Sequence, residues 1–252
     1  MKNIIKSMNV DWKVFKKLVA YNISFFIAFL LIFNIFSFIT SGITSKLSAN
    51  AGYDASKLTV ESLKISQPNV GGLMFVLLVL VFLLIVVQMY NYSFFENKIW
   101  NIIFNKKTTF RNTSKFLLLN LLMTTIFSAM LFIIFAVISK FQGNLIKIGV
   151  MVFYLALLFC IYLIFVGYWA FGRTHLVIKS LREVYNTGVK RIDLTVLPLI
   201  VSIIVFIIVN LILKVFSLLS EMILLILSSI TLVAYLAWFR LYLTNALKSV
   251  KL

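Results

Sequence analysis

Amide side chains interrupt the long apolar stretches of this chain, and four of them are singled out as candidate sites: Asn22, Gln88, Asn120 and Asn210. Each amide carries hydrogen-bond donors and an acceptor, and inside an apolar helix its usual role is a bond to a neighbouring helix. Such a bond stabilises a helix pair by about 0.6–2 kcal/mol. The alternative role is a polar lining for the path of a solute or a lipid headgroup. The sequence predicts that these residues are the intramembrane polar sites.

A second set of residues stands near the ends of the apolar stretches, where contact with a cytoplasmic partner or with lipid headgroups is predicted. The set comprises Glu96, Trp100, Arg111, Lys115, Lys179 and Arg182. Glu96 lies near a span end, where a long side chain can extend into the headgroup layer. Trp100 fits the aromatic belt of a membrane interface. The cations are suited to anionic headgroups.

The residues of an enzyme, a metal site or a cofactor site are missing from the sequence. His175 is the single histidine and Cys160 the single cysteine, so paired histidine ligands, an intrachain disulfide and a cysteine cluster are all excluded. No phosphate-binding loop, nucleophile elbow or zinc-binding histidine pair occurs. Ionisable residues are predicted only near span ends, which disfavours a proton- or ion-coupled carrier. We therefore predict no catalytic, metal or cofactor-binding residues.

The composition of the chain requires an apolar solvent. Of its 252 residues, 62% are hydrophobic and 12% charged, and the mean hydropathy is +1.07. Soluble domains are about 45–50% apolar and about 25% charged. Six stretches reach the roughly 20 residues that a helix needs to cross a bilayer. They are Leu18–Thr40, Gly71–Tyr90, Phe116–Ile138, Ile148–Phe171, Leu194–Leu213 and Met222–Leu243. We predict an all-α membrane protein, a single domain over residues 1–252, with six transmembrane helices arranged as three hairpins.

The basic residues fall mainly on one side of the predicted spans. Eighteen of the 24 Lys and Arg residues lie in the N-terminal segment, the second and fourth connections and the C-terminal end. Because an excess of Lys and Arg marks the cytoplasmic side, both termini are predicted in the cytoplasm, with the protein in the cell membrane. The net charge of +17 has the same explanation, so no nucleic-acid partner is predicted.

An internal repeat accompanies this layout. Lys2–Asn22 aligns without a gap with Trp100–Asn120, so that Asn22 matches Asn120. The repeating unit would be a basic interfacial segment followed by a hairpin of two spans, and its copies would cover residues 2–94, 100–171 and 180–245.

Two of the interfacial segments, Asn97–Asn105 and Leu176–Asn186, place apolar residues on one helical face and polar residues on the other. Short helices of this kind lie in the headgroup layer with their cations toward anionic lipid. We predict them as separate cytoplasmic helices. A plain topological anchor is the more common role of such segments.

The segment Phe95–Leu119 resembles the second connection of ABC-2-type permeases. In that family a Glu ends span two, a short coupling helix follows, and an Arg and a Lys precede span three. Glu96, Arg111 and Lys115 occupy these positions. The resemblance implies a permease subunit that works with an ATPase on a separate chain. The family carries a long re-entrant segment between spans five and six, whereas this chain has only Lys214–Glu221 there.

The whole-chain layout, and Ser180–Leu213 in particular, is similar to uncharacterised archaeal and bacterial six-helix membrane proteins, a resemblance that implies a fold and no activity. The preferred hypothesis is a non-enzymatic integral membrane protein whose basic segments contact anionic lipid headgroups. Its role would be membrane organisation or the handling of lipid or solute. The alternative is a permease subunit with its ATPase docked on Asn97–Lys115.

Overall fold

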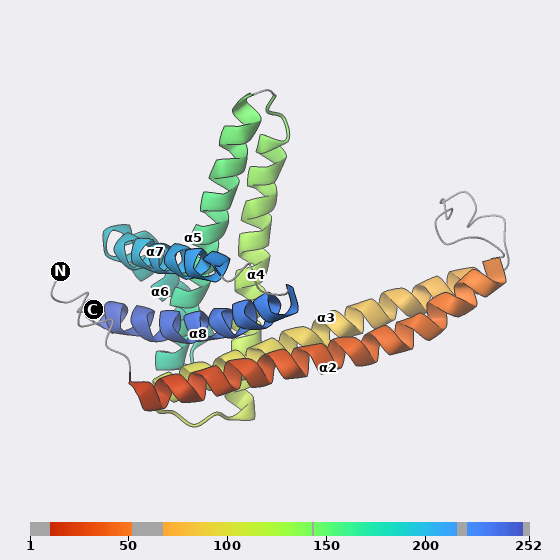
Figure 1. The fold of residues 1–252 in the computed structure, drawn as a ribbon, viewed down its shortest axis with the longest axis horizontal. Coiled ribbons are helices and arrows are strands. Elements are labelled where there is room, and N and C mark those ends of the chain that lie inside the picture. The colour runs from red at the N-terminus through yellow and green to blue at the C-terminus, as the bar shows by residue number, and fades with distance from the viewer. Residues whose placement is uncertain (1–10, 52–67, 143, 216–220, 249–252) are drawn as a thin grey trace. The chain divides into compact units, whose positions relative to one another are not determined.

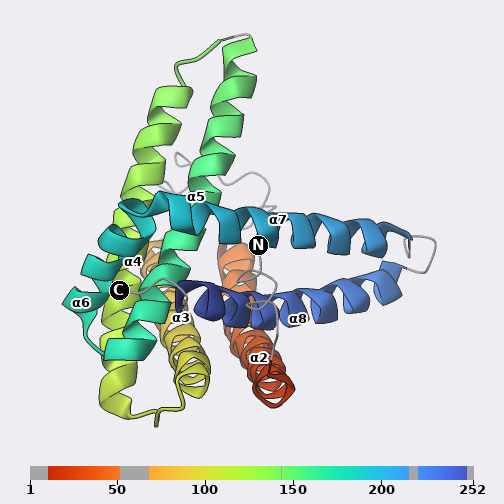
Figure 2. The same cartoon turned by 90° about the vertical axis from the view of Figure 1, so that its left-hand side faces the viewer.

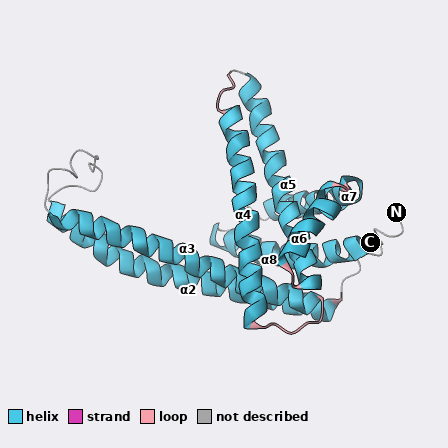
Figure 3. Ribbon diagram, turned by 180° about the vertical axis from the view of Figure 1, so that it is seen from behind, coloured by secondary structure: helices cyan, strands magenta, loops and turns pink. Residues whose placement is uncertain are grey.

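The chain folds into helices throughout the residues that the computed structural model describes, which are 11–51, 68–142, 144–215 and 221–248. Figure 1 shows their order and Figure 3 shows that the regular elements of these ranges are helical. The elements are α2 (Trp12–Ala51), α3 (Pro68–Ile103), α4 (Phe110–Ile138), α5 (Asn144–Thr174), α6 (Val177–Glu183), the π-helix η3 (Val184–Val189), α7 (Ile192–Val215) and α8 (Glu221–Lys248). The all-α prediction is confirmed.

Five helices in the described part are long and apolar enough to cross a membrane. Their spans are Trp12–Ser45, Gly72–Ile103, Phe110–Ile138, Leu145–Thr174 and Ile223–Leu247. Large apolar side chains on these helices stay exposed, with Phe38 83%, Phe132 71% and Leu78 69% accessible. Helices satisfy their backbone hydrogen bonds internally, so such surfaces are stable in lipid and unfavourable in water. The chain is therefore built as a multi-pass membrane protein.

The predicted fifth span, Leu194–Leu213, differs from the other five. It lies within α7, a 24-residue helix that contains Pro198. The apolar part of α7 that the structure describes is Pro198–Lys214, which is shorter than a membrane span. The count of six spans and the arrangement in three hairpins therefore stay predictions.

The chain divides into two compact units, which are described separately. Unit 2 is Ser24–Tyr92 and holds parts of α2 and α3. Within it the two helices lie side by side, as Figure 1 shows. The Gln88 amide donates to the carbonyl oxygen of Phe29 at 3.1 Å, and the rings of Phe25 and Tyr92 meet edge to face at 5.8 Å.

Unit 1 comprises Met1–Ile23 and Ser93–Leu252. In it α4 packs against α5, and α7 packs against α8, as Figure 2 shows. One part of its core joins Leu18 of α2, Ile99 of α3 and Leu241 of α8.

Aromatic packing holds α4 against α5 in a second part of this core. The ring of Phe116 on α4 lies 4.8 Å from Tyr168 and 5.2 Å from Phe171, both on α5. These contacts hold the last turns of α5 against α4.

The helices of unit 1 end in turns with recognisable chemistry. α3 is closed by Asn105, whose φ of 51° lies in the left-handed region that asparagine tolerates. The Lys106 amide then donates to the Asn101 carbonyl at 2.8 Å. α4 begins at Phe110 and is capped by Thr109, whose hydroxyl accepts from the Asn112 amide at 3.3 Å. The connection Phe104–Thr109 between these ends contains no helix.

The prediction of separate interfacial helices is wrong for Asn97–Asn105 and needs correction for Leu176–Asn186. The first segment forms the last turns of α3 and the turn that ends it. Its polar residues Asn97 and Asn101 are buried because Thr113 and Thr108 supply hydrogen-bond partners inside the protein. The second segment forms α6 and continues directly into the π-helix η3.

Candidate functional site

One face of α3 carries a buried polar stripe. Ser93, Glu96, Asn97, Trp100 and Asn101 follow the spacing of a single helical face, and each is at most 4% exposed. Without a hydrophobic force between helices in lipid, polar side chains on facing helices can hold the bundle together. This stripe forms the polar core of unit 1. It lies at the end of unit 1 that carries the basic connections α3–α4 and α5–α6, and we name this end the basic end.

A buried ion pair connects α3 to α8 in this core. The Arg240 guanidinium bonds to the Glu96 carboxylate, and the two side chains are only 4% and 5% exposed. Arg240 also donates through Nη1 to Oδ1 of Asn22 on α2, at 3.1 Å. Asn22, Glu96 and Arg240 thus tie three helices together.

The expectation that Glu96 extends into the headgroup layer is corrected by this pair. A carboxylate removed from water needs a cation and hydrogen bonds, because its desolvation is otherwise too costly. Arg240, 144 residues further along the chain, supplies both. The pair lies near the ends of the predicted spans, but it is buried inside the protein and does not extend into the headgroup layer.

Three atoms of this cluster keep unused hydrogen-bonding capacity within the described part of the chain. They are Oε2 of Glu96, Nε of Arg240 and Nδ2 of Asn22, all buried. Buried polar atoms are normally bonded to protein or to water. The cluster therefore offers one acceptor and two donors to a further small polar group.

Asn120 forms a second interhelical connection. Its Oδ1 accepts from the Tyr168 hydroxyl of α5 at 2.7 Å, and its Nδ2 donates to Ser93 of α3 at 3.3 Å. Asn120 and Asn22 occupy matching positions of the sequence repeat, and both are buried and bonded to other helices.

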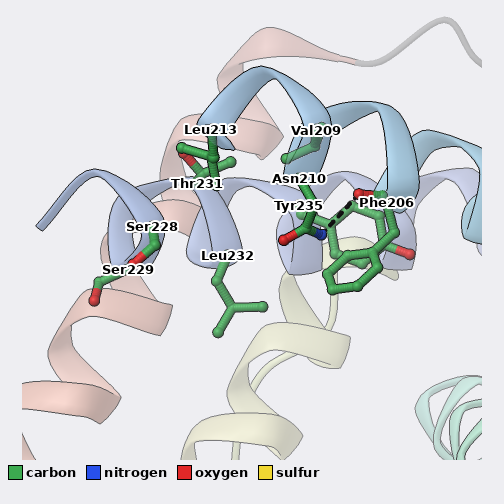
Figure 4. A pocket seen from close by; sticks show the side chains of 9 residues that line it. All are labelled: Phe206, Val209, Asn210, Leu213, Ser228, Ser229, Thr231, Leu232 and Tyr235. Atoms are coloured by element: carbon green, nitrogen blue, oxygen red, sulfur yellow. Dashed lines mark hydrogen bonds between the residues drawn. The ribbon is translucent and has the colours of Figure 1, made fainter. Parts of the chain in front are cut away.

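The other two amides lie elsewhere. Gln88 belongs to unit 2, where it bonds to Phe29. Asn210 is exposed, bonds to the Phe206 carbonyl of its own helix at 2.8 Å and lines a cavity between α7 and α8 (Figure 4). Within unit 1, Asn210 thus takes no part in the hydrogen bonds of Asn22 and Asn120.

Trp100 is fully buried, so the structure does not place it at a lipid interface. It packs where α5 approaches α3 at Gly172. A Cβ added to Gly172 would lie 3.3 Å from Cβ of Trp100 and 2.7 Å from the Phe104 ring. The small residue lets the two helices approach closely, as is common in membrane bundles.

The basic end also carries a group of cations close to one another. The Lys106 ammonium donates to the backbone carbonyl of Arg173. Partial burial, and then the Arg173 charge, lower the pKa of Lys106. Burial also lowers the pKa of His175, and the charges of Lys106 and Lys115 add to this effect.

No acidic side chain that the structure describes neutralises this group. Asp11 accepts from the amides at the start of α2. Glu96 is held by Arg240, and Glu183 accepts from Thr187. Among the described side chains, these cations therefore have no carboxylate partner.

The α6–η3 segment exposes both apolar and basic side chains. Its inner face is formed by the buried residues Ser180, Val184, Thr187 and Gly188. Its outer face presents Ile178, 83% exposed, and Tyr185, 55% exposed, beside the exposed Lys179 and Arg182. Arg111 is exposed on α4, and Lys115 is half-buried.

No family model, curated protein or solved structure matches this chain. The function is therefore argued from the geometry of unit 1.

Sequence reasoning did not identify Arg240 as part of the polar core. A signal was present, because Arg240 lies inside the predicted sixth span Met222–Leu243 with apolar residues on both sides. An arginine within a span is a functional-site candidate by default. The pairing of Arg240 with Glu96 could not be predicted, because neither spacing nor the repeat connects the two residues.

Proposed function

We propose that this is a non-enzymatic protein of the cell membrane, with both termini in the cytoplasm, whose basic end contacts anionic lipid headgroups. The observation that carries the proposal is the outer face of α6–η3. Ile178 and Tyr185 project away from the protein beside Lys179 and Arg182. A helix that combines apolar and basic side chains on its free surface is suited to the boundary between headgroups and acyl chains.

The charge of this surface favours acidic lipids over neutral ones. Each Lys or Arg near an anionic membrane contributes about 1 kcal/mol of attraction. Lys179, Arg182, Lys190 and Arg191 are all exposed on or directly after α6–η3. Lys106 and Arg173 add two further cations on the neighbouring connections. The surface would enrich anionic lipid around the basic end of the protein.

The packing of this surface supports the same proposal, because α6 and η3 both pack against α5. The Glu96–Arg240 pair and the bonds of Asn120 hold α2, α3, α4, α5 and α8 together close to the basic end. A rigid arrangement of cations binds headgroups with less loss of conformational entropy than a mobile one.

The permease alternative receives less support. It needs a cytoplasmic segment on which an ATPase can dock between α3 and α4. Residues Asn97–Ile103 belong to α3, with Asn97, Trp100 and Asn101 buried in the core, and Phe104–Thr109 contains no helix. An ATPase would have to dock on Arg111, Lys115 and the α6–η3 surface.

Lipid enrichment tests the proposal directly. The full-length protein would be purified in mild detergent from membranes that contain phosphatidylglycerol, and its bound lipid measured by native mass spectrometry. Lys179→Ser combined with Arg182→Ser should reduce the bound anionic lipid several-fold. The matched control is Lys140→Ser combined with Lys147→Ser, which removes two exposed lysines at the other end of the α4–α5 pair.

Equal lipid content in the two double variants would contradict the proposal. Stoichiometric recovery of a nucleotide-binding subunit, lost on Arg111→Glu, would establish the permease alternative.

A further inference from the structure

A cavity of about 250 Å³ lies between α7 and α8, away from the polar core of the basic end. Figure 4 shows Asn210 and Phe206 of α7 close to Tyr235 of α8. The Phe206 and Tyr235 rings lie 5.3 Å apart and close one side of the space. The remaining lining combines apolar side chains with the hydroxyl groups of Ser228, Ser229 and Thr231.

The hydroxyl groups around the cavity have no hydrogens left to donate. Ser228 and Ser229 both donate to the Leu225 carbonyl, at 2.9 and 2.8 Å. Thr231 and Tyr235 also donate to backbone carbonyls, at 2.7 and 3.0 Å. A hydroxyl carries one hydrogen and two acceptor lone pairs, so each of these oxygens can now only accept.

Asn210 completes the set of polar groups. One hydrogen of its Nδ2 is used on the Phe206 carbonyl at 2.8 Å. The second N–H and the Oδ1 oxygen have no hydrogen-bond partner among the described residues. A free amide edge of this kind can accept a bond from a hydroxyl and donate one back.

Among the residues that the structure describes, no charged side chain lines the cavity. An ion bound there would have no counter-charge in an apolar setting, which is strongly unfavourable. The apolar share of the lining, including Val209, Leu213 and Leu232, requires an equally apolar body on the ligand.

We propose that this cavity binds a neutral membrane-dissolved alcohol, with its hydroxyl on Asn210 and its hydrocarbon part along Leu213 and Leu232. The acceptor-rich lining selects a ligand that donates a hydrogen bond. The site is separate from the anionic lipid surface and does not depend on it, because neither α6 nor the cations of the basic end take part.

Photolabelling of the full-length protein in lipid nanodiscs tests the site. The probe is a long-chain primary alcohol that carries a diazirine, and the comparison probe is its methyl ether, which cannot donate a hydrogen bond. The alcohol should label residues 206–213 and 228–235, in competition with unlabelled alcohol, and the ether should label them several-fold less.

Two variants make the test specific. Asn210→Leu should reduce labelling by the alcohol about threefold to thirtyfold, the loss expected for one intramembrane hydrogen bond. The matched control is Asn34→Leu, because Asn34 is also exposed and also donates to the carbonyl four residues earlier, Leu30, at 2.9 Å, but does not line the cavity. Leu232→Trp, a change on α8, the helix opposite Asn210, should fill the space and so reduce labelling by the alcohol.

The proposal is overturned if the alcohol and the ether label equally, or if Asn210→Leu labels as strongly as Asn34→Leu. It is also overturned if photo-cross-linking at this cavity joins the chain to a second copy of itself and not to the alcohol. The occupant of the cavity would then be a helix of that copy.

Discussion

Replacing Arg240 by methionine should be among the most destabilising single changes in this protein. Arg240 bonds to Glu96 with both side chains at most 5% exposed, and it also donates to Asn22 at 3.1 Å. Methionine keeps much of the volume but leaves the Glu96 carboxylate buried without a cation. Breaking a buried pair in this way costs about 3–5 kcal/mol. At roughly 2–4 °C per kcal/mol, the melting temperature should fall by about 6–20 °C.

The double variant decides whether the cost comes from the unpaired charge. Arg240→Met combined with Glu96→Leu removes both charges, and apolar replacements of buried pairs are often close to neutral. Asn22 still loses its partner, which costs about 1 kcal/mol. The double variant should therefore lie within about 2 kcal/mol of the parent and be more stable than Arg240→Met alone.

Thermal unfolding of the purified protein in mild detergent measures these differences. Arg182→Met is the matched control, because Arg182 is exposed and changes of that kind stay within about 0.5 kcal/mol. The reasoning is refuted if Arg240→Met melts at the same temperature as the control, or if the double variant is no more stable than Arg240→Met alone. Either result would mean that the pair does not hold α3 and α8 together.

Two further predictions follow from the same structure. Asn22→Leu and Asn120→Leu should each lower detergent stability by up to about 2 kcal/mol, because each removes a bond to another helix; two variants as stable as the parent would show that these bonds contribute nothing. Both termini are predicted in the cytoplasm, so in a Cys160→Ala background an impermeant thiol reagent applied to intact cells should reach Ser139→Cys and not Lys106→Cys. The opposite labelling pattern would reverse the orientation.

The sequence alone identifies this chain as a helical membrane protein, because its composition decides that class. A chain that is 62% hydrophobic has more apolar surface than a soluble core can bury, so long apolar helices in a bilayer are the available solution. The same reasoning placed Asn22 and Asn120 within apolar stretches, and the structure gives both of them partners on other helices.

The positions of Glu96 and Trp100 depended on the tertiary structure. The separate apolar and polar faces of Asn97–Asn105 predict a helix in the headgroup layer with its polar face toward lipid. In a membrane the surroundings are as apolar as the core, so the pattern does not distinguish lipid from protein. α3 in fact turns its polar face inward, where Glu96 meets Arg240.

The partner of Glu96 is 144 residues away along the chain, and no local pattern contains that contact. Composition and charge determined that this chain enters a membrane and which end carries the cations. Only the packing of α2, α3 and α8 decided which polar side chains meet, because a buried charge takes its partner from whichever helix lies beside it.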